Sequence, residues 1–60
     1  MTHFELENSI YEFVTAVRLN SMELLNSIDP GLQFHLLEEI EERVRYLRKL
    51  LEKEKANEDV

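Results

Sequence analysis

Cysteine is absent from this 60-residue chain, which also has one glycine and one proline. The lack of cysteine excludes disulfides and thiolate metal sites as ways to stabilise the fold. No apolar run approaches the ~20 residues of a membrane span. The first residues lack the basic start and the apolar stretch of a signal peptide. We therefore expect a cytoplasmic protein that is held together by non-covalent packing.

Motifs that would indicate a chemistry are also missing. There is no phosphate-binding loop and no nucleophile motif, and the two histidines, His3 and His35, lie far apart in the chain. His35 shares one side of a predicted helix with three glutamates, but that side lies away from the apolar seam and the order is not the Glu-x-x-His of di-iron bundles. The sequence therefore predicts no catalytic site, no metal, no cofactor and no small-molecule substrate.

Acidic residues outnumber basic ones by thirteen to seven, which gives a net charge of −6. Such a chain repels nucleic-acid phosphates unless its basic residues are grouped. The one basic cluster comprises Arg43, Arg45, Arg48 and Lys49, and glutamates are interleaved with it. We interpret this cluster as a salt-bridged face exposed to solvent.

The single proline and glycine both lie near the midpoint, at Pro30 and Gly31. Asp29 can cap a helix that begins at Pro30, because proline is favoured at a first helical position. At the other end, Thr2 and Glu5 have the spacing of a capping box. The predicted elements are a helix over about 3–27, a bend at 28–29, a helix over about 30–55 and a frayed tail at 56–60. So short a bend makes the two helices antiparallel neighbours.

Apolar residues recur at helical spacing on both sides of the bend. A lone hairpin is too thin to bury a self-sufficient core, and without disulfides it needs a partner chain. We therefore predict an all-α fold in which an antiparallel two-helix hairpin dimerises into a four-helix bundle. The residues predicted to form its core and dimer contact are Val14, Ser21, Leu25, Ile28, Leu37, Ile40, Val44, Leu47 and Leu51.

The apolar face of the first helix is wider than one helix–helix contact requires. If the core positions face inward, Phe13, Val17 and Leu24 point partly outward and form a docking row for a partner protein. In the alternative, the helix is rotated and this row lies inside. The sequence leaves both arrangements open.

An ungapped stretch from about Phe13 to Leu47 resembles the Rop family, small RNA-binding regulators of plasmid copy number. Residues that look the same are Phe13, Leu19, Glu23, Leu25, Asn26, Asp29, Gln33 and Glu38. The resemblance implies a dimeric four-helix bundle and RNA binding through one face of the first helix.

On that face the family has Asn, Phe, Gln and Lys, whereas this chain has Ser9, Phe13, Val17 and Leu24, so Phe13 alone matches. Losing the lysine and the amides removes the attraction and the hydrogen bonds that RNA contact needs. The expected function is a non-enzymatic regulatory or adaptor protein, a homodimer that binds a partner protein. The alternative is a Rop-like RNA-binding regulator of plasmid replication.

Overall fold

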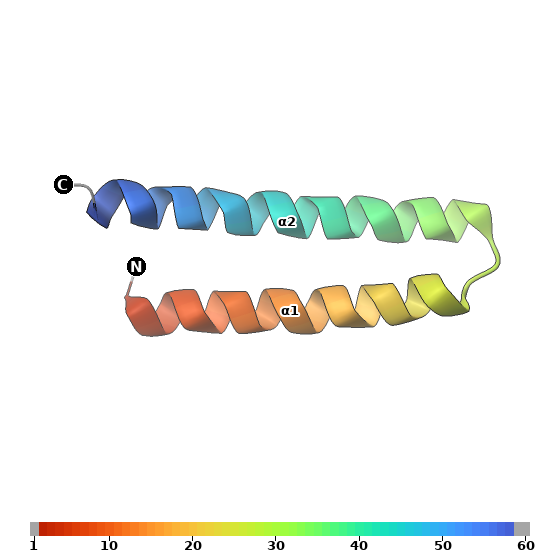
Figure 1. The fold of residues 1–60 in the computed structure, drawn as a ribbon. Coiled ribbons are helices and arrows are strands. Elements are labelled where there is room, and N and C mark those ends of the chain that lie inside the picture. Colours follow the sequence, from red (N-terminus) through yellow and green to blue (C-terminus); the bar gives the residue numbers. More distant parts are fainter. Residues whose placement is uncertain (1, 59–60) are drawn as a thin grey trace.

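The computed structural model describes residues 2–58 and consists of a helical hairpin (Figure 1). Helix α1 spans His3–Asn26 and helix α2 spans Pro30–Glu58. The two helices run antiparallel and side by side, and the start of α1 and the end of α2 both lie away from the bend. The molecule measures 48 × 16 × 10 Å. It is therefore a single layer of two packed helices with two broad sides.

Helix α1 begins where the capping pattern predicts. The backbone N–H of Glu5 donates to the Thr2 hydroxyl at 3.1 Å, which satisfies one of the free donors of the first turn. The helix ends at Asn26, one residue earlier than predicted, because Ser27 has an extended backbone (φ −90°, ψ 140°).

Side chains close the bend. The Asp29 carboxylate accepts from the backbone N–H of Gly31 at 3.2 Å, and the Ser27 hydroxyl accepts from the N–H of Asp29 at 3.2 Å. The side-chain amide of Gln33 donates to the carbonyl of Ser27 at 2.8 Å, which ties the start of α2 to the end of α1. Three residues therefore suffice to reverse the chain.

Helix α2 continues to Glu58, past the predicted end near residue 55 and into the tail that was expected to fray. The tail lacks apolar periodicity, but Lys55 and Ala56 are strong helix formers and no glycine or proline follows Gly31 in the helix. Helix α2 therefore continues past its last apolar contacts, because the helix propensity of these residues still favours helical backbone. Residues 59–60 of the expected frayed tail lie outside the described residues.

Little of the hairpin is buried. Among the described residues, Leu36 (2% exposed) and Asn20 (7%) are the buried side chains. The accessible surface is 5160 Å², whereas a compact protein of this mass has about 4100 Å² by the usual scaling of surface with mass. About 1000 Å² per chain is thus left uncovered relative to a compact fold. No helix in the described part of the chain is long and apolar enough to cross a membrane.

Candidate protein-interaction surface

The seam between the helices is formed by residues spaced three or four apart on each helix. On α1 the least exposed positions are Leu6, Ser9, Phe13, Ala16, Val17, Asn20 and Leu24, and Ser27 follows just past its end. On α2 they include Gln33, Leu36, Glu39, Ile40, Leu47 and Leu50. This spacing places each set along one stripe of its helix. The two stripes face each other and use up the inner side of the hairpin.

The predicted docking row lies in this seam. Phe13, Val17 and Leu24 are all half-buried, and Phe13 lies beside Leu47 of α2. The structure thus favours the alternative in which α1 is rotated and the row lies inside. Binding of a partner by these three residues stays a prediction that would require the hairpin to open.

A polar contact interrupts the seam at its middle. The side-chain amide of Asn20 donates to Oε2 of Glu39 at 3.3 Å, and His35 Nε2 lies 3.1 Å from the other oxygen of the same carboxylate. Glu39 is one of the three glutamates that share a side of the helix with His35, the side that the sequence pattern assigns to solvent, yet it is half-buried. A buried amide needs a partner, and the Asn20 position on the inner stripe was the signal that could have identified this contact.

A second apolar surface lies beside the seam, and we call it the open face. Its residues are Ile10, Val14, Leu25, Leu37, Val44 and Leu51, with exposures from 37% for Ile10 to 84% for Leu25. At about 100° per residue, those of each helix are turned from the seam by roughly a quarter to a third of a turn, in the same rotational sense. Because the helices are antiparallel, the two sets fall on one side of the hairpin.

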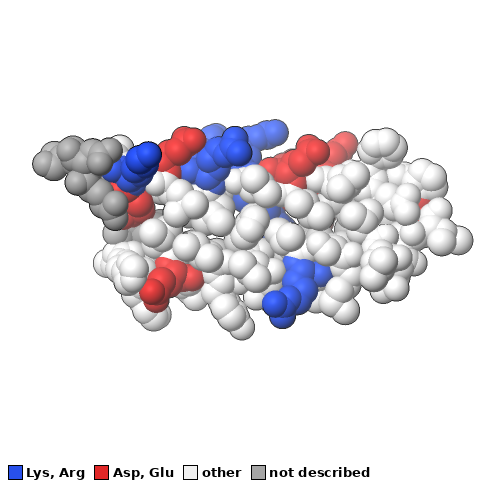
Figure 2. Space-filling model, in the orientation of Figure 1, with Lys and Arg blue, Asp and Glu red and all other residues white. Residues whose placement is uncertain are grey.

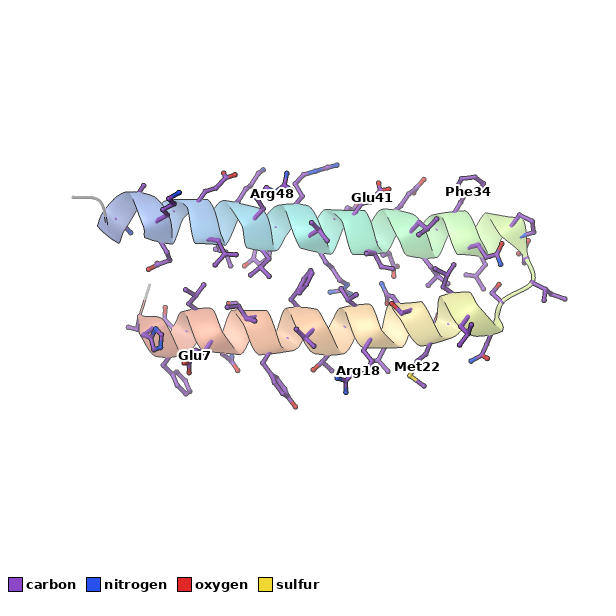
Figure 3. All side chains as sticks on the ribbon, in the orientation of Figure 1. Glu7, Arg18, Met22, Phe34, Glu41 and Arg48 are labelled. Atoms are coloured by element: carbon purple, nitrogen blue, oxygen red, sulfur yellow. The ribbon has the colours of Figure 1, made fainter. Side chains whose placement is uncertain are left out.

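The open face is uncharged along its centre and charged at its edges. Figure 2 shows this side, with acidic and basic side chains along the outer edge of α2 and two isolated charges below, over α1. Figure 3 shows Glu41 and Arg48 pointing outward from α2, and Glu7 and Arg18 pointing outward from α1. An apolar centre with a charged rim is the usual build of a protein–protein contact.

The open face also contains a hollow. It has a volume of about 330 Å³ and is lined by Phe13, Val44, Leu47 and Leu51, with Arg48, Glu52 and Lys55 around it. The other broad side carries a hollow of about 400 Å³ with a different lining, in which Glu12, Glu39, Glu42 and Arg43 accompany Tyr46. These two hollows therefore differ in chemistry, and the one on the open face is suited to receive apolar side chains.

The residues predicted as dimer core divide between seam and open face. Ile40 and Leu47 are half-buried in the seam, whereas Val14, Leu25, Leu37, Val44 and Leu51 lie on the open face. Ile28 is exposed in the bend, and Ser21 is exposed on α1. One hairpin taken from a four-helix bundle has this distribution. Part of the apolar stripe on each helix is covered by the other helix of the same chain, and part is exposed. Their contact with a second chain stays a prediction.

Among the described residues, no group of three or more His, Asp or Glu side chains could hold a metal ion. His3 and His35 each pair with the glutamate one turn ahead. No protein family, curated protein or solved structure matches the chain. The structure shows a helical hairpin, and its open face is the feature from which a function can be argued.

Proposed function

We propose that this chain is a small non-enzymatic regulatory or adaptor protein that works as a homodimeric four-helix bundle and binds a partner protein. The observation that carries the proposal is the open face. Large apolar side chains of both helices, among them Val14, Leu37 and Val44, lie on one side with 40–45% of their surface exposed. Contiguous apolar patches of this kind on small proteins mark interaction sites.

The size of the uncovered surface fits a dimer contact. A standard protein–protein interface buries about 800 Å² on each partner, and the hairpin exposes about 1000 Å² more than a compact chain of its mass. At about 25 cal/mol for each Å² of apolar surface removed from water, covering this face is a large gain for a chain with one fully buried leucine. A second hairpin has a complementary face of the same length.

Binding of another protein would use apolar surface that the dimer leaves bare. The outer side of α1 carries Phe4 (77% exposed), Tyr11 (71%) and Met22 (55%). Figure 3 shows Met22 pointing away from α2. These side chains lie beyond the edge of the open face, so a partner protein and a second copy could bind at once. This assignment keeps the docking site on α1 but places it outside the seam.

One set of glutamate variants tests both parts of the proposal. Val44→Glu, on the open face, should convert the dimer to a monomer in sedimentation equilibrium at micromolar concentration. Tyr11→Glu should leave the dimer intact and abolish capture of a stoichiometric partner from native cells. Phe34→Glu is the matched control, since Phe34 is 68% exposed and points away from α1, and it should change neither result.

A wild-type chain that sediments as a folded monomer at this concentration would contradict the dimer. Partner capture that persists in Tyr11→Glu would place the docking site elsewhere. The helical circular dichroism signals of Val44→Glu and Phe34→Glu are compared as well. This comparison separates a folding defect in Val44→Glu from dissociation of a folded dimer.

The Rop-like alternative has less support. Phe13, the one residue that matches the RNA-contacting face of that family, is half-buried in the seam. Arg18 is the one Lys or Arg of α1, and an RNA site needs several positive charges to offset phosphate repulsion. The hairpin architecture resembles that family, whereas the surface chemistry favours a protein partner.

A further inference from the structure

We propose that the two copies pack open face to open face around a two-fold axis that runs parallel to the helices, so that both bends lie at the same end of the bundle. The inference rests on the proposed homodimer and names its geometry. Two hairpins of equal length can also pack with their bends at opposite ends. The charges along the edges of the open face distinguish the two arrangements.

Arg18 and Glu41 lie at the same level of the hairpin. Asn20 contacts Glu39 across the seam, and in antiparallel helices two residues back on one helix correspond to two residues onward on the other. Figure 3 shows that the two side chains nevertheless point away from each other, Arg18 from the outer edge of α1 and Glu41 from the outer edge of α2. Within one chain the full width of the hairpin separates them.

A two-fold rotation about an axis parallel to the helices places the second copy with its α1 and α2 edges exchanged. Each residue keeps its position along the length of the bundle. The α1 edge of one copy then lies along the α2 edge of the other, and Arg18 meets Glu41 of the second copy. Symmetry makes this contact twice. At the end away from the bends, Glu7 lies at the level of Glu52 of the second copy, which Arg48 and Lys55 flank one turn away on either side. The charge complementarity of each edge therefore rests on the contact between Arg18 and Glu41.

Rotation about an axis perpendicular to the helices pairs each edge with itself in reverse. Glu41 then meets Arg48 of the second copy, but the α1 edge gains no opposite charge, because Arg18 lies opposite the level of Tyr11 and Glu7 opposite that of Met22. The first arrangement satisfies both edges and the second satisfies one. Exposed ion pairs add little affinity, but such pairs fix register and orientation when apolar burial supplies the affinity.

Charge reversal tests the geometry. In Arg18→Glu, two glutamates meet at each contact, and in Glu41→Arg two arginines meet, so each variant alone should dimerise about tenfold more weakly at low salt. An equimolar mixture of the two should form a heterodimer as stable as the wild type, since both contacts are again opposite in sign. The dissociation constants are measured by sedimentation equilibrium, with 0.5 M salt as the control that suppresses the difference.

A second mixture tests the competing geometry. Glu41→Arg with Arg48→Glu should restore full dimerisation only if the bends lie at opposite ends, and in that case Arg18→Glu alone should dimerise like the wild type. That pair of results overturns the inference while the proposed dimer stands. A wild-type chain that is monomeric removes the proposed dimer itself, so the two failures are distinguishable.

An engineered thiol gives an independent measurement, because the natural chain has no cysteine. Ile28 lies in the bend and is 96% exposed. The Ile28→Cys variant should form a disulfide-linked dimer rapidly under mild oxidation if the bends are neighbours. If the bends lie at opposite ends of a molecule 48 Å long, the link does not form within the dimer, and this result would contradict the shared-end arrangement.

Discussion

Leu36 and Leu37 are neighbours of the same type, yet their environments differ sharply. Leu36 is 2% exposed in the seam, whereas Leu37 is 42% exposed on the open face. One step along a helix turns a side chain by about 100°, which separates the inner stripe from its flank. The residue that holds the hairpin together is therefore not the one that would hold two hairpins together.

The two leucines should respond differently to truncation. Leu36→Ala should cost about 2–5 kcal/mol, as expected for a fully buried leucine, and the loss should be the same at every protein concentration. Leu37→Ala should destabilise the protein mainly at concentrations where it is dimeric. Urea unfolding followed by circular dichroism over a hundredfold concentration range measures both, and equal concentration dependence in the two variants would contradict the division between seam and open face.

The bend shows how two helix signals act at the level of an element. Asp29 caps α2 and Pro30 begins it, while Gly31 lies in the first helical turn with negative φ. The glycine is therefore not needed for a left-handed turn. A Cβ at this position would lie 3.6 Å from the nearest atom, an Asp29 carboxylate oxygen, which is ordinary van der Waals contact.

We expect Gly31→Ala to stabilise the protein by about 0.5–1 kcal/mol, because alanine favours the helix and restricts the unfolded chain. Asp29→Ala should instead cost about 1 kcal/mol through the lost cap. Thermal and urea denaturation of both variants provide the measurement. Destabilisation by Gly31→Ala would show that the bend requires a conformation that only glycine adopts.

At the scale of the whole molecule, most of the described side chains are at least partly exposed and very few are buried. A hairpin 10 Å thick has one contact seam, and a chain of this size usually needs a staple or a partner to be stable. The sequence has no cysteine, and the proposed association of two copies would supply that partner.

The thermal midpoint should therefore rise by several degrees for each tenfold increase in protein concentration, since binding of a second copy stabilises the folded state by mass action. Differential scanning calorimetry between 10 μM and 1 mM measures the dependence, and Val44→Glu should remove it. A midpoint that is constant over this range in the wild type would show that the single hairpin is stable by itself.

Sequence alone determined the hairpin. The capping pattern at Thr2, the Asp29–Pro30 start signal and the helical spacing of apolar residues are local features, and local hydrogen bonds and propensities act on them directly. The end of α2 was placed too early because propensity, and not packing, decides where an unpacked helix stops. The rotation of α1 was open for a related reason, since its apolar arc was wide enough for two orientations.

Only the tertiary structure decided that rotation. In the structure, the half-buried Phe13, Val17 and Leu24 lie in the seam with α2, and Glu39 accepts a hydrogen bond from Asn20. Val14, Leu37 and Val44 are exposed. The physical reason is that an apolar stripe specifies which residues avoid water but not which neighbour covers them. The neighbour that covers each residue depends on how the apolar stripes of the two helices, which differ in width, fit together. The sequence of one helix alone does not specify this fit.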